Sequence, residues 1–213
     1  MVKLGVLISG RGSNLQALMA ATARDDYPAE IALVVSNQPQ AAGLERAREA
    51  GLATAAFDHR DFADRQNFEA EIDASLRGAG VELVCLAGFM RLLTAGFLEG
   101  WPDRVVNIHP SLLPAFPGIH VHEQVVASGA RFSGCTVHFV RPEMDAGPII
   151  IQSLVPVRPD DDADTLAARV LATEHQCYPK AVKWIAEGRV RINGDLVEVD
   201  GAGTPQMAAI NPI

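Results

Sequence analysis

Hydrophobic residues gather in short runs that alternate with longer segments of helical periodicity. Short apolar runs between polar or glycine-containing segments are typical of buried strands, and spacings of three and four residues indicate helices. Strands are predicted at residues 2–8, 31–35, 52–57, 81–87, 105–106, 132–140 and 148–157. A first helix is predicted from Ser13, with Leu15, Leu18 and Met19 facing inward, and a second from residue 41 to a C-cap at Gly51. A third helix is predicted where Phe68, Ile72 and Leu76 share one face, and a short one near residues 94–98.

Most of the predicted strands are continuously apolar, which favours parallel strands covered on both faces. We therefore predict an α/β fold with a doubly wound, mostly parallel twisted sheet, whose ligands gather at the carboxyl ends of the strands. Asn193 and Gly194 between two further runs predict a C-terminal antiparallel hairpin. The acidic segment 159–164 is expected to cap a helix, and that helix is expected to kink or restart at Pro179.

Composition limits the function classes. The 213 residues, 48% hydrophobic and 21% charged, are expected to form one globular domain over 1–200, followed by a tail at 201–213. A formal charge of −8 without a basic stripe disfavours a nucleic-acid partner. Three cysteines without CxxC spacing indicate a reducing compartment, with Cys85 buried. No apolar stretch approaches the roughly 20 residues of a membrane span, so a cytoplasmic protein without a membrane partner is expected.

The sequence SGRGSN at 9–14 joins the first predicted strand to the first helix. Gly10 and Gly12 allow close approach of the backbone, and Ser13 and Asn14 stand at the helix start, where backbone N–H groups bind anions. The pattern does not complete a dinucleotide fingerprint, because Leu15 replaces the third glycine, and it lacks the lysine of a Walker A loop. A tight turn without a ligand is the alternative.

Asn107 and His109 follow another buried run and open a proline-rich loop from residue 108 to 120. In extended chain they project to the same side, and both donate hydrogen bonds, which suits stabilisation of an oxyanion on a carbonyl. Asp145 ends a later strand, and a carboxylate near His109 would favour the imidazolium and could accept protons. The alternatives are a turn cap for Asn107, a structural histidine and a turn-forming aspartate.

Taken together, SGRGSN, AGFMRLL, NIHPSLLPAFPG, the HFV…MDAGPII run and EHQCYP resemble phosphoribosylglycinamide formyltransferases, in order and nearly as far as residue 190. The resemblance implies a Rossmann-like formyltransferase fold with a phosphate-binding half at 1–100 and a catalytic and folate half at 101–200. It implies transfer of the formyl group of 10-formyltetrahydrofolate to the amine of glycinamide ribonucleotide in purine biosynthesis, by a monomer or homodimer. Arg141 and Pro142 depart from the acidic pair often found there in similar proteins.

The resemblance also implies residue roles. The catalytic residues would be Asn107, His109 and Asp145. Binding of the ribonucleotide would fall to Gly10, Arg11, Gly12, Ser13, Asn14 and Glu174. The folate would be bound by Arg65, Phe89, Met90, Arg91, Leu92, Leu93, Val140 and Asp145.

Several alternatives stand beside this prediction. His120, His122 and His138 could form a metal site with His109, but formyl transfer to an amine needs no metal, and we expect His120 and His138 to support the site instead. A formyltetrahydrofolate deformylase would use water as acceptor and is expected to carry a further N-terminal domain. A formylmethionyl-tRNA-forming enzyme would add an RNA-binding domain, and a non-enzymatic nucleotide-binding module would leave the three polar residues without a role.

Overall fold

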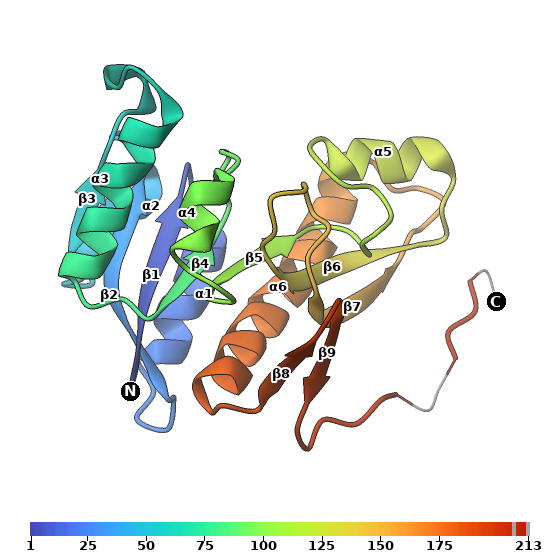
Figure 1. The fold of residues 1–213 in the computed structure, drawn as a ribbon. Helices are drawn as coiled ribbons and strands as arrows, with labels where there is room; N and C mark the ends of the chain where they lie inside the picture. Colours follow the sequence, from blue (N-terminus) through green and yellow to red (C-terminus); the bar gives the residue numbers. More distant parts are fainter. Residues whose placement is uncertain (206–207, 212–213) are drawn as a thin grey trace. The chain divides into compact units, whose positions relative to one another are not determined.

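The computed structural model describes residues 1–205 and 208–211 (Figure 1). Helices and strands alternate through most of the chain, as the hydrophobic pattern predicts. The strands are β1 (Val2–Ile8), β2 (Ala29–Ser36), β3 (Thr54–Ala56), β4 (Leu83–Leu86), β5 (Val105–His109), β6 (Phe132–Phe139), β7 (Ile149–Pro156), β8 (Val190–Asn193) and β9 (Leu196–Val199). The helices are α1 (Ser13–Thr22), α2 (Ala42–Glu49), α3 (Arg65–Gly78), α4 (Ala95–Glu99), α5 (Val121–Ser128) and α6 (Ala163–Ala186), with a 3-10 turn at His59–Asp61.

Seven strands form one sheet in the order β3-β2-β1-β4-β5-β6-β7. The pairs β1–β2, β2–β3, β1–β4 and β4–β5 are parallel, and β6–β7 is antiparallel. Strands β8 and β9 form a separate antiparallel hairpin. The predicted Rossmann-like sheet and C-terminal hairpin are therefore confirmed.

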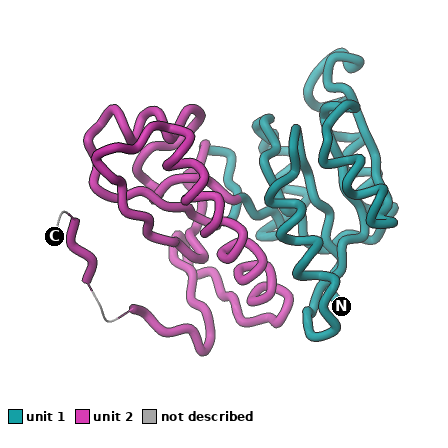
Figure 2. Tube along the Cα trace, turned by 180° about the vertical axis from the view of Figure 1, so that it is seen from behind, with its two compact units in different colours: residues 1–107, 139–143 teal, residues 108–138, 144–213 magenta. Residues whose placement is uncertain are grey.

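The chain divides into two compact units (Figure 2). Unit 1 comprises residues 1–107 and 139–143, and unit 2 comprises residues 108–138 and 144–213. In unit 1 the strand order reverses between β1 and β4, so the connections that leave these two neighbouring strands diverge. Such a switch point leaves a crevice at the carboxyl ends of the strands, which is where ligands bind in folds of this kind.

Helices cover both faces of the sheet in unit 1. A Cβ atom on Gly5 would lie 2.4 Å from Leu76 of α3, and one on Gly43 of α2 would lie 2.5 Å from Ile8. Gly5 and Ile8 point to opposite faces of β1 because side chains alternate along a strand. The core on the α3 face includes Leu7, Leu33, Val35, Phe68, Ile72, Leu76, Val84, Leu86 and Phe97.

Unit 2 places the long helix α6 against β7, with α5 beside α6. The acidic segment before α6 acts as predicted, because Asp162 is the N-cap and forms a capping box with Thr165. The expected restart at Pro179 is wrong, since α6 continues as one helix to Ala186. Tyr178 and Ala181, on either side of the proline, are fully buried, and this packing outweighs the loss of one backbone hydrogen bond. Of the expected tail, Met207 and Ile213 lie outside the described residues.

All three cysteines are reduced and buried. Cys85 lies on β4 in unit 1, and Cys135 and Cys177 lie in unit 2. The hydrogen bond between the two thiols raises the pKa of Cys135 far above its ordinary value and lowers the pKa of Cys177. In the described part of the chain, no helix is both long and apolar enough to span a bilayer.

Candidate active site

The proline-rich loop after β5 is ordered by side chains from the strands of unit 2. The buried hydroxyl of Thr136 donates to the carbonyl of Ser111 at 2.7 Å and accepts the N–H of Leu113 at 3.1 Å. Gln152 donates to the carbonyl of Leu113 at 2.9 Å. The loop also contains a cis peptide bond between Leu113 and Pro114. These contacts fix the backbone that follows His109.

His109 and Asp145 come together in unit 2, as the sequence predicts. The Nδ1 atom of His109 lies 3.5 Å from Oδ2 of Asp145, and the two side chains are 6% and 12% exposed. The N–H of Gly118 donates to the same Oδ2 atom at 2.8 Å. His138, almost fully buried, places Nε2 at 3.9 Å from Oδ1. The carboxylate is thus held by groups from three segments of the unit.

The second ring nitrogen of His109 has a partner of known polarity. Nε2 donates to the carbonyl of Phe116 at 2.9 Å, and a carbonyl oxygen can only accept. The proton on Nε2 therefore fixes the orientation of the ring. A second proton, on Nδ1, would make the ring cationic and would face the Asp145 carboxylate. Because Nε2 is bound to Phe116, Nδ1 is the only ring nitrogen that could also donate to a ligand.

Three residues around this pair have backbone conformations that side chains rarely adopt. Phe116, His120 and Asp145 have φ angles of 54°, 56° and 54°. Left-handed conformations cost non-glycine residues of the order of 1 kcal/mol each and concentrate at functional sites. Their clustering in the two segments that hold the His109–Asp145 pair singles out this region of unit 2.

The other histidines of this region differ in their contacts. His120 is exposed and lies 3.5 Å from Glu123 at the start of α5, whereas His138 adjoins Asp145. Burial lowers the pKa of His122, the charge on Glu123 raises it and nearby His109 lowers it. His122 is thus biased towards its neutral form beside His109. Within the described residues, no three His, Cys, Asp or Glu side chains are arranged to hold a metal ion.

Asn107 and Glu174 complete the polar residues predicted from the sequence. Asn107 pairs with Leu86 in the register of β4 and β5 and lies two residues before His109 on β5. Glu174 lies on α6 in unit 2 and is 7% exposed. The backbone at both positions is therefore fixed by regular secondary structure.

The predicted phosphate loop lies in unit 1 between β1 and α1. Gly12 is the N-cap of α1 with φ +71°, and it offers no side chain to cap the first turn. The carbonyl of Gly10 accepts the N–H of Gly43 at 3.0 Å, and the carbonyl of Arg11 accepts from Arg46 at 2.6 Å. The loop is therefore tied to α2 through its carbonyl groups, while the start of α1 retains the polarity that suits an anion.

Except for Asp145, which lies in unit 2, the predicted folate residues also lie in unit 1. Phe89 and Leu93 are buried in the core and Val140 packs against it, whereas Met90 and Leu92 are 68% and 55% exposed. Arg65 lies at the exposed start of α3, and Arg91 lies between Met90 and Leu92 in the sequence. Arg141, which departs from the family pattern, pairs with Asp103 at 2.6 Å.

Several residues in these contacts were not singled out in the sequence. Phe116 and Gly118 lie within NIHPSLLPAFPG, and the Phe-Pro-Gly sequence there was the available signal. Ser9, Asn37 and Glu69 form hydrogen bonds to distant segments of unit 1, and nothing in the local sequence indicates these contacts.

The chain matches known proteins along most of its length. The model of the family described as formyl transferase matches residues 2–182. A phosphoribosylglycinamide formyltransferase from Haemophilus influenzae is 39% identical over 211 residues, which cover 99% of this chain and all of that protein. The trifunctional purine biosynthetic protein adenosine-3 of Drosophila melanogaster is 48% identical over 197 residues, 91% of this chain but only 14% of that protein.

The solved structures agree. A glycinamide ribonucleotide transformylase 1 from Symbiobacterium toebii has a TM-score of 0.92 and 46% sequence identity, covering 93% of this chain and 94% of that one. Fold and sequence thus define an enzyme that transfers formyl groups. The chain belongs to the formyl transferase family, and its resemblance to phosphoribosylglycinamide formyltransferases is confirmed.

Proposed function

We propose that this enzyme transfers the formyl group of 10-formyltetrahydrofolate to the amine of glycinamide ribonucleotide, with Asn107, His109 and Asp145 as catalytic residues. The observation that carries the proposal is the pairing of His109 with Asp145 at 3.5 Å in a largely buried setting. The names of the relatives, which refer to phosphoribosylglycinamide and to purine biosynthesis, support the acceptor and the pathway.

The acceptor amine needs no strong base before it attacks. Its pKa is expected to lie near that of a chain terminus, about 8, so a useful fraction is neutral at pH 7. Attack on the formyl carbon creates a tetrahedral oxyanion and a far more acidic ammonium group. The site must therefore donate hydrogen bonds to the oxygen and accept a proton from the nitrogen.

The polar residues divide these two tasks. The amide of Asn107 donates to the oxyanion. The Nδ1–H of His109 also donates to it and is shared with the Asp145 carboxylate 3.5 Å away, since Nε2 is occupied by the carbonyl of Phe116. Asp145 accepts the proton from the ammonium group, directly or through water. The N–H of Gly118, 2.8 Å from Oδ2, holds the carboxylate in position for this step. Breakdown of the intermediate then breaks the bond between the formyl carbon and N10 of the folate, which leaves as tetrahydrofolate after it takes up a proton.

The binding residues follow the same proposal. The start of α1 and the loop of residues 10–14 would bind the ribonucleotide phosphate, and Glu174 would bind its ribose. The apolar segment 88–93 with Val140 would form a wall for the flat heterocycle of the folate, and Arg65 would bind its acidic end. Residues 1–100 would thus bind the phosphate and supply most of the folate residues, and residues 101–200 would carry the catalytic groups with Glu174 and Val140.

The decisive experiment compares acceptors. The protein is mixed with 10-formyltetrahydrofolate and either glycinamide ribonucleotide or water alone, and conversion of the folate is followed by absorbance. Conversion that depends on the amine is expected, and Asp145→Ala should abolish it while the mutation of a solvent-exposed acid, Glu99→Gln, should not. Equal conversion without the amine would identify a deformylase, and binding without conversion would identify a non-enzymatic module.

A further inference from the structure

The segment of residues 88–93, between β4 and α4 in unit 1, is held at its start by a residue of the β1 connection. The N–H of Ser9 donates to the carbonyl of Gly88 at 3.1 Å, and the N–H of Met90 donates to Oγ of Ser9 at 2.7 Å. Ser9 directly precedes Gly10 of the phosphate loop. One residue therefore joins the two connections that diverge at the switch point of the sheet.

A buried amide fixes the direction of the Ser9 hydroxyl. Oγ of Ser9 donates to Oδ1 of Asn37 at 2.5 Å, and Asn37 follows β2 with 2% of its surface exposed. Because the hydroxyl proton is committed to Asn37, a lone pair of the same oxygen is free to accept from Met90. Ser9 is therefore the acceptor and the Met90 amide the donor in this contact.

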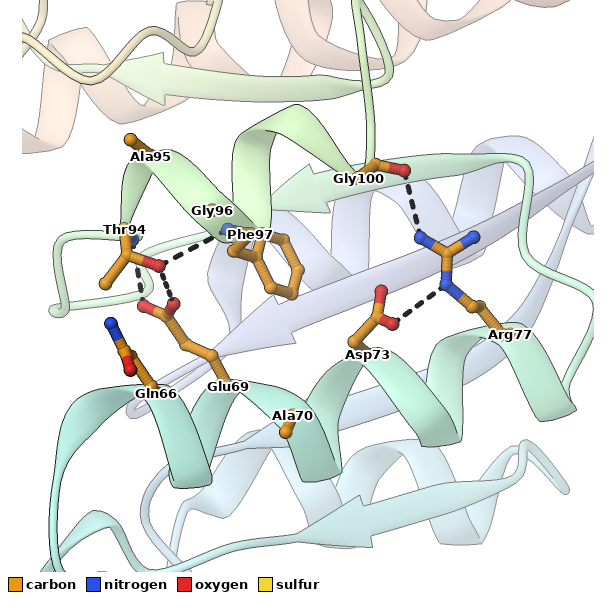
Figure 3. Close-up of a pocket in the computed structure, with 10 residues that line it drawn as sticks. All are labelled: Gln66, Glu69, Ala70, Asp73, Arg77, Thr94, Ala95, Gly96, Phe97 and Gly100. Carbon is orange, nitrogen blue, oxygen red and sulfur yellow. Dashed lines mark hydrogen bonds and ion pairs between the residues drawn. The ribbon is translucent and has the colours of Figure 1, made fainter.

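The other end of the segment is held by a buried acid. Glu69 on α3 is 3% exposed, and its carboxylate accepts the N–H of Thr94 at 2.9 Å and also the Thr94 hydroxyl (Figure 3). Thr94 in turn is the N-cap of α4 and accepts the N–H of Phe97 at 3.3 Å. Hydrogen bonds to a carboxylate are stronger than those between neutral groups, so this end is firmly fixed.

A cavity adjoins this second anchor. It has a volume of ≈ 490 Å³ and lies between α3 and α4, lined among others by Gln66, Glu69 and Thr94 (Figure 3). Thr94 is therefore not enclosed by packed side chains on this side. Its position depends on the carboxylate of Glu69 more than a residue in a close-packed core would.

Between the anchors, the side chains alternate in exposure. Phe89 and Leu93 are each 8% exposed, while Met90 and Leu92 are 68% and 55% exposed. Fixing both ends determines which side chains enter the core and which face outward. The outward apolar side chains are among those that the proposed function assigns to the folate.

We propose that Ser9 and Glu69 are positioning residues for the folate, acting through the backbone of Met90 and Thr94. This inference rests on the proposed function. Ser9 affects both substrates, because it also precedes the phosphate loop, whereas Glu69 affects the folate alone. Neither residue needs to contact a substrate.

The test measures KM for each substrate in Glu69→Met, which removes both acceptors at similar size, and in Ser9→Ala. Glu69→Met is expected to raise KM for 10-formyltetrahydrofolate about tenfold and to leave KM for the ribonucleotide unchanged. Ser9→Ala should raise both. Glu69→Gln, which keeps one acceptor for the Thr94 amide, should recover part of the loss.

Asp73→Asn is the matched control. Asp73 lies one turn further along α3, lines the same cavity and accepts from Trp101 at 2.6 Å and Arg77 at 2.8 Å, and both of these partners lie outside residues 88–94 (Figure 3). It should lower the melting temperature without changing KM for the folate. An equal rise of that KM in Asp73→Asn would overturn the inference, as would an unchanged KM in folded Glu69→Met.

Hydrogen exchange separates the inference from the proposed function. Without any substrate, the Met90 amide should lose protection in Ser9→Ala and the Thr94 amide in Glu69→Met or, if that variant fails to fold, in Glu69→Gln. Unchanged protection would overturn the anchors even if the enzyme is active. A wild-type protein without folate-dependent transfer would instead overturn the proposed function, and with it the role of the anchors in folate binding.

Discussion

The imidazole of His109 and the carboxylate of Asp145 lie 3.5 Å apart, although 36 residues separate them in the chain. His109 ends β5, and Asp145 lies in the connection between β6 and β7. The N–H of Gly118 and the carbonyl of Phe116 hold the two side chains from the loop between them. The pair is therefore an assembled feature of unit 2, and it can be tested one group at a time.

Replacing Asp145 by Asn tests the charge of this pair. The change keeps the size of the side chain and an oxygen for the Gly118 amide, but it removes the negative charge facing Nδ1 of His109. We expect turnover to fall by about 10²-fold or more and the pH–rate profile to change shape, because proton acceptance is lost. Steady-state rates from pH 5 to 9 measure this, and a profile like that of the wild type would contradict the coupling.

Replacing Asn107 by Ala removes one proposed donor to the oxyanion. The expected cost is about 3 kcal/mol of transition-state stabilisation, or around a hundredfold in kcat. KM for both substrates should change far less, because the donor acts on charge that develops only in the transition state. Near-normal turnover in this variant would refute the role of Asn107.

Replacing Gly43 by Ala tests the support of the phosphate loop. The added Cβ would lie 2.5 Å from Cδ1 of Ile8 and 3.2 Å from both the Gly10 carbonyl and Gly12 Cα, so the Ile8 side chain must move and the loop must give way slightly. We expect a stability loss of about 1–3 kcal/mol and a raised KM for the ribonucleotide. Gly78→Ala on α3, where a Cβ meets nothing within 4 Å, is the control and should leave KM unchanged without loss of stability. An unchanged KM in Gly43→Ala would argue against this loop as the phosphate site.

The ion pair between Asp161 and Arg169 is expected to contribute stability that is lost in acid. Hydrogen bonds from Arg169 lower the pKa of Asp161 from 3.8 to about 2, and its side chain is 3% exposed. Since the folded pKa is the lower one, the ionised carboxylate stabilises the fold above about pH 4, and this contribution is lost as the pH falls towards 2. Asp161→Asn should cost about 1–2 kcal/mol at pH 7 and much less near pH 2, as measured by urea unfolding. An equal cost at both pH values would show that the ion pair is not the cause.

The sequence predicts the sheet and its helices well because the signals are local. Continuous apolar runs mark the buried strands, and Asn193 with Gly194 marks the turn of the hairpin. The expected restart of the helix at Pro179 was wrong for the same reason. A local rule ends the helix there, but the buried residues on both sides of the proline hold α6 together through packing that the local sequence does not reveal.

The candidate site was only partly predictable. Asn107 and His109 at the end of β5 could be located, because polar residues directly after an apolar run are conspicuous. Asp145 was expected at a strand end but lies in the connection between β6 and β7. The residues that orient the site could not be located from the sequence. Ser9 contacts Met90 across 81 positions of the chain and Glu69 contacts Thr94 across 25, and such pairs depend on the order of strands in the sheet and on which helix faces which loop.

Because all three thiols are buried, their chemical reactivity reports unfolding of the segments that bury them. A reagent that modifies thiols should react slowly with the native protein and at once with the unfolded chain, since Cys85 and Cys135 have no exposed surface and Cys177 has 7%. Cys85 reports on unit 1 and the other two on unit 2. The order in which these cysteines become reactive in rising urea would reveal whether the two units unfold together or one before the other, and no introduced label is needed.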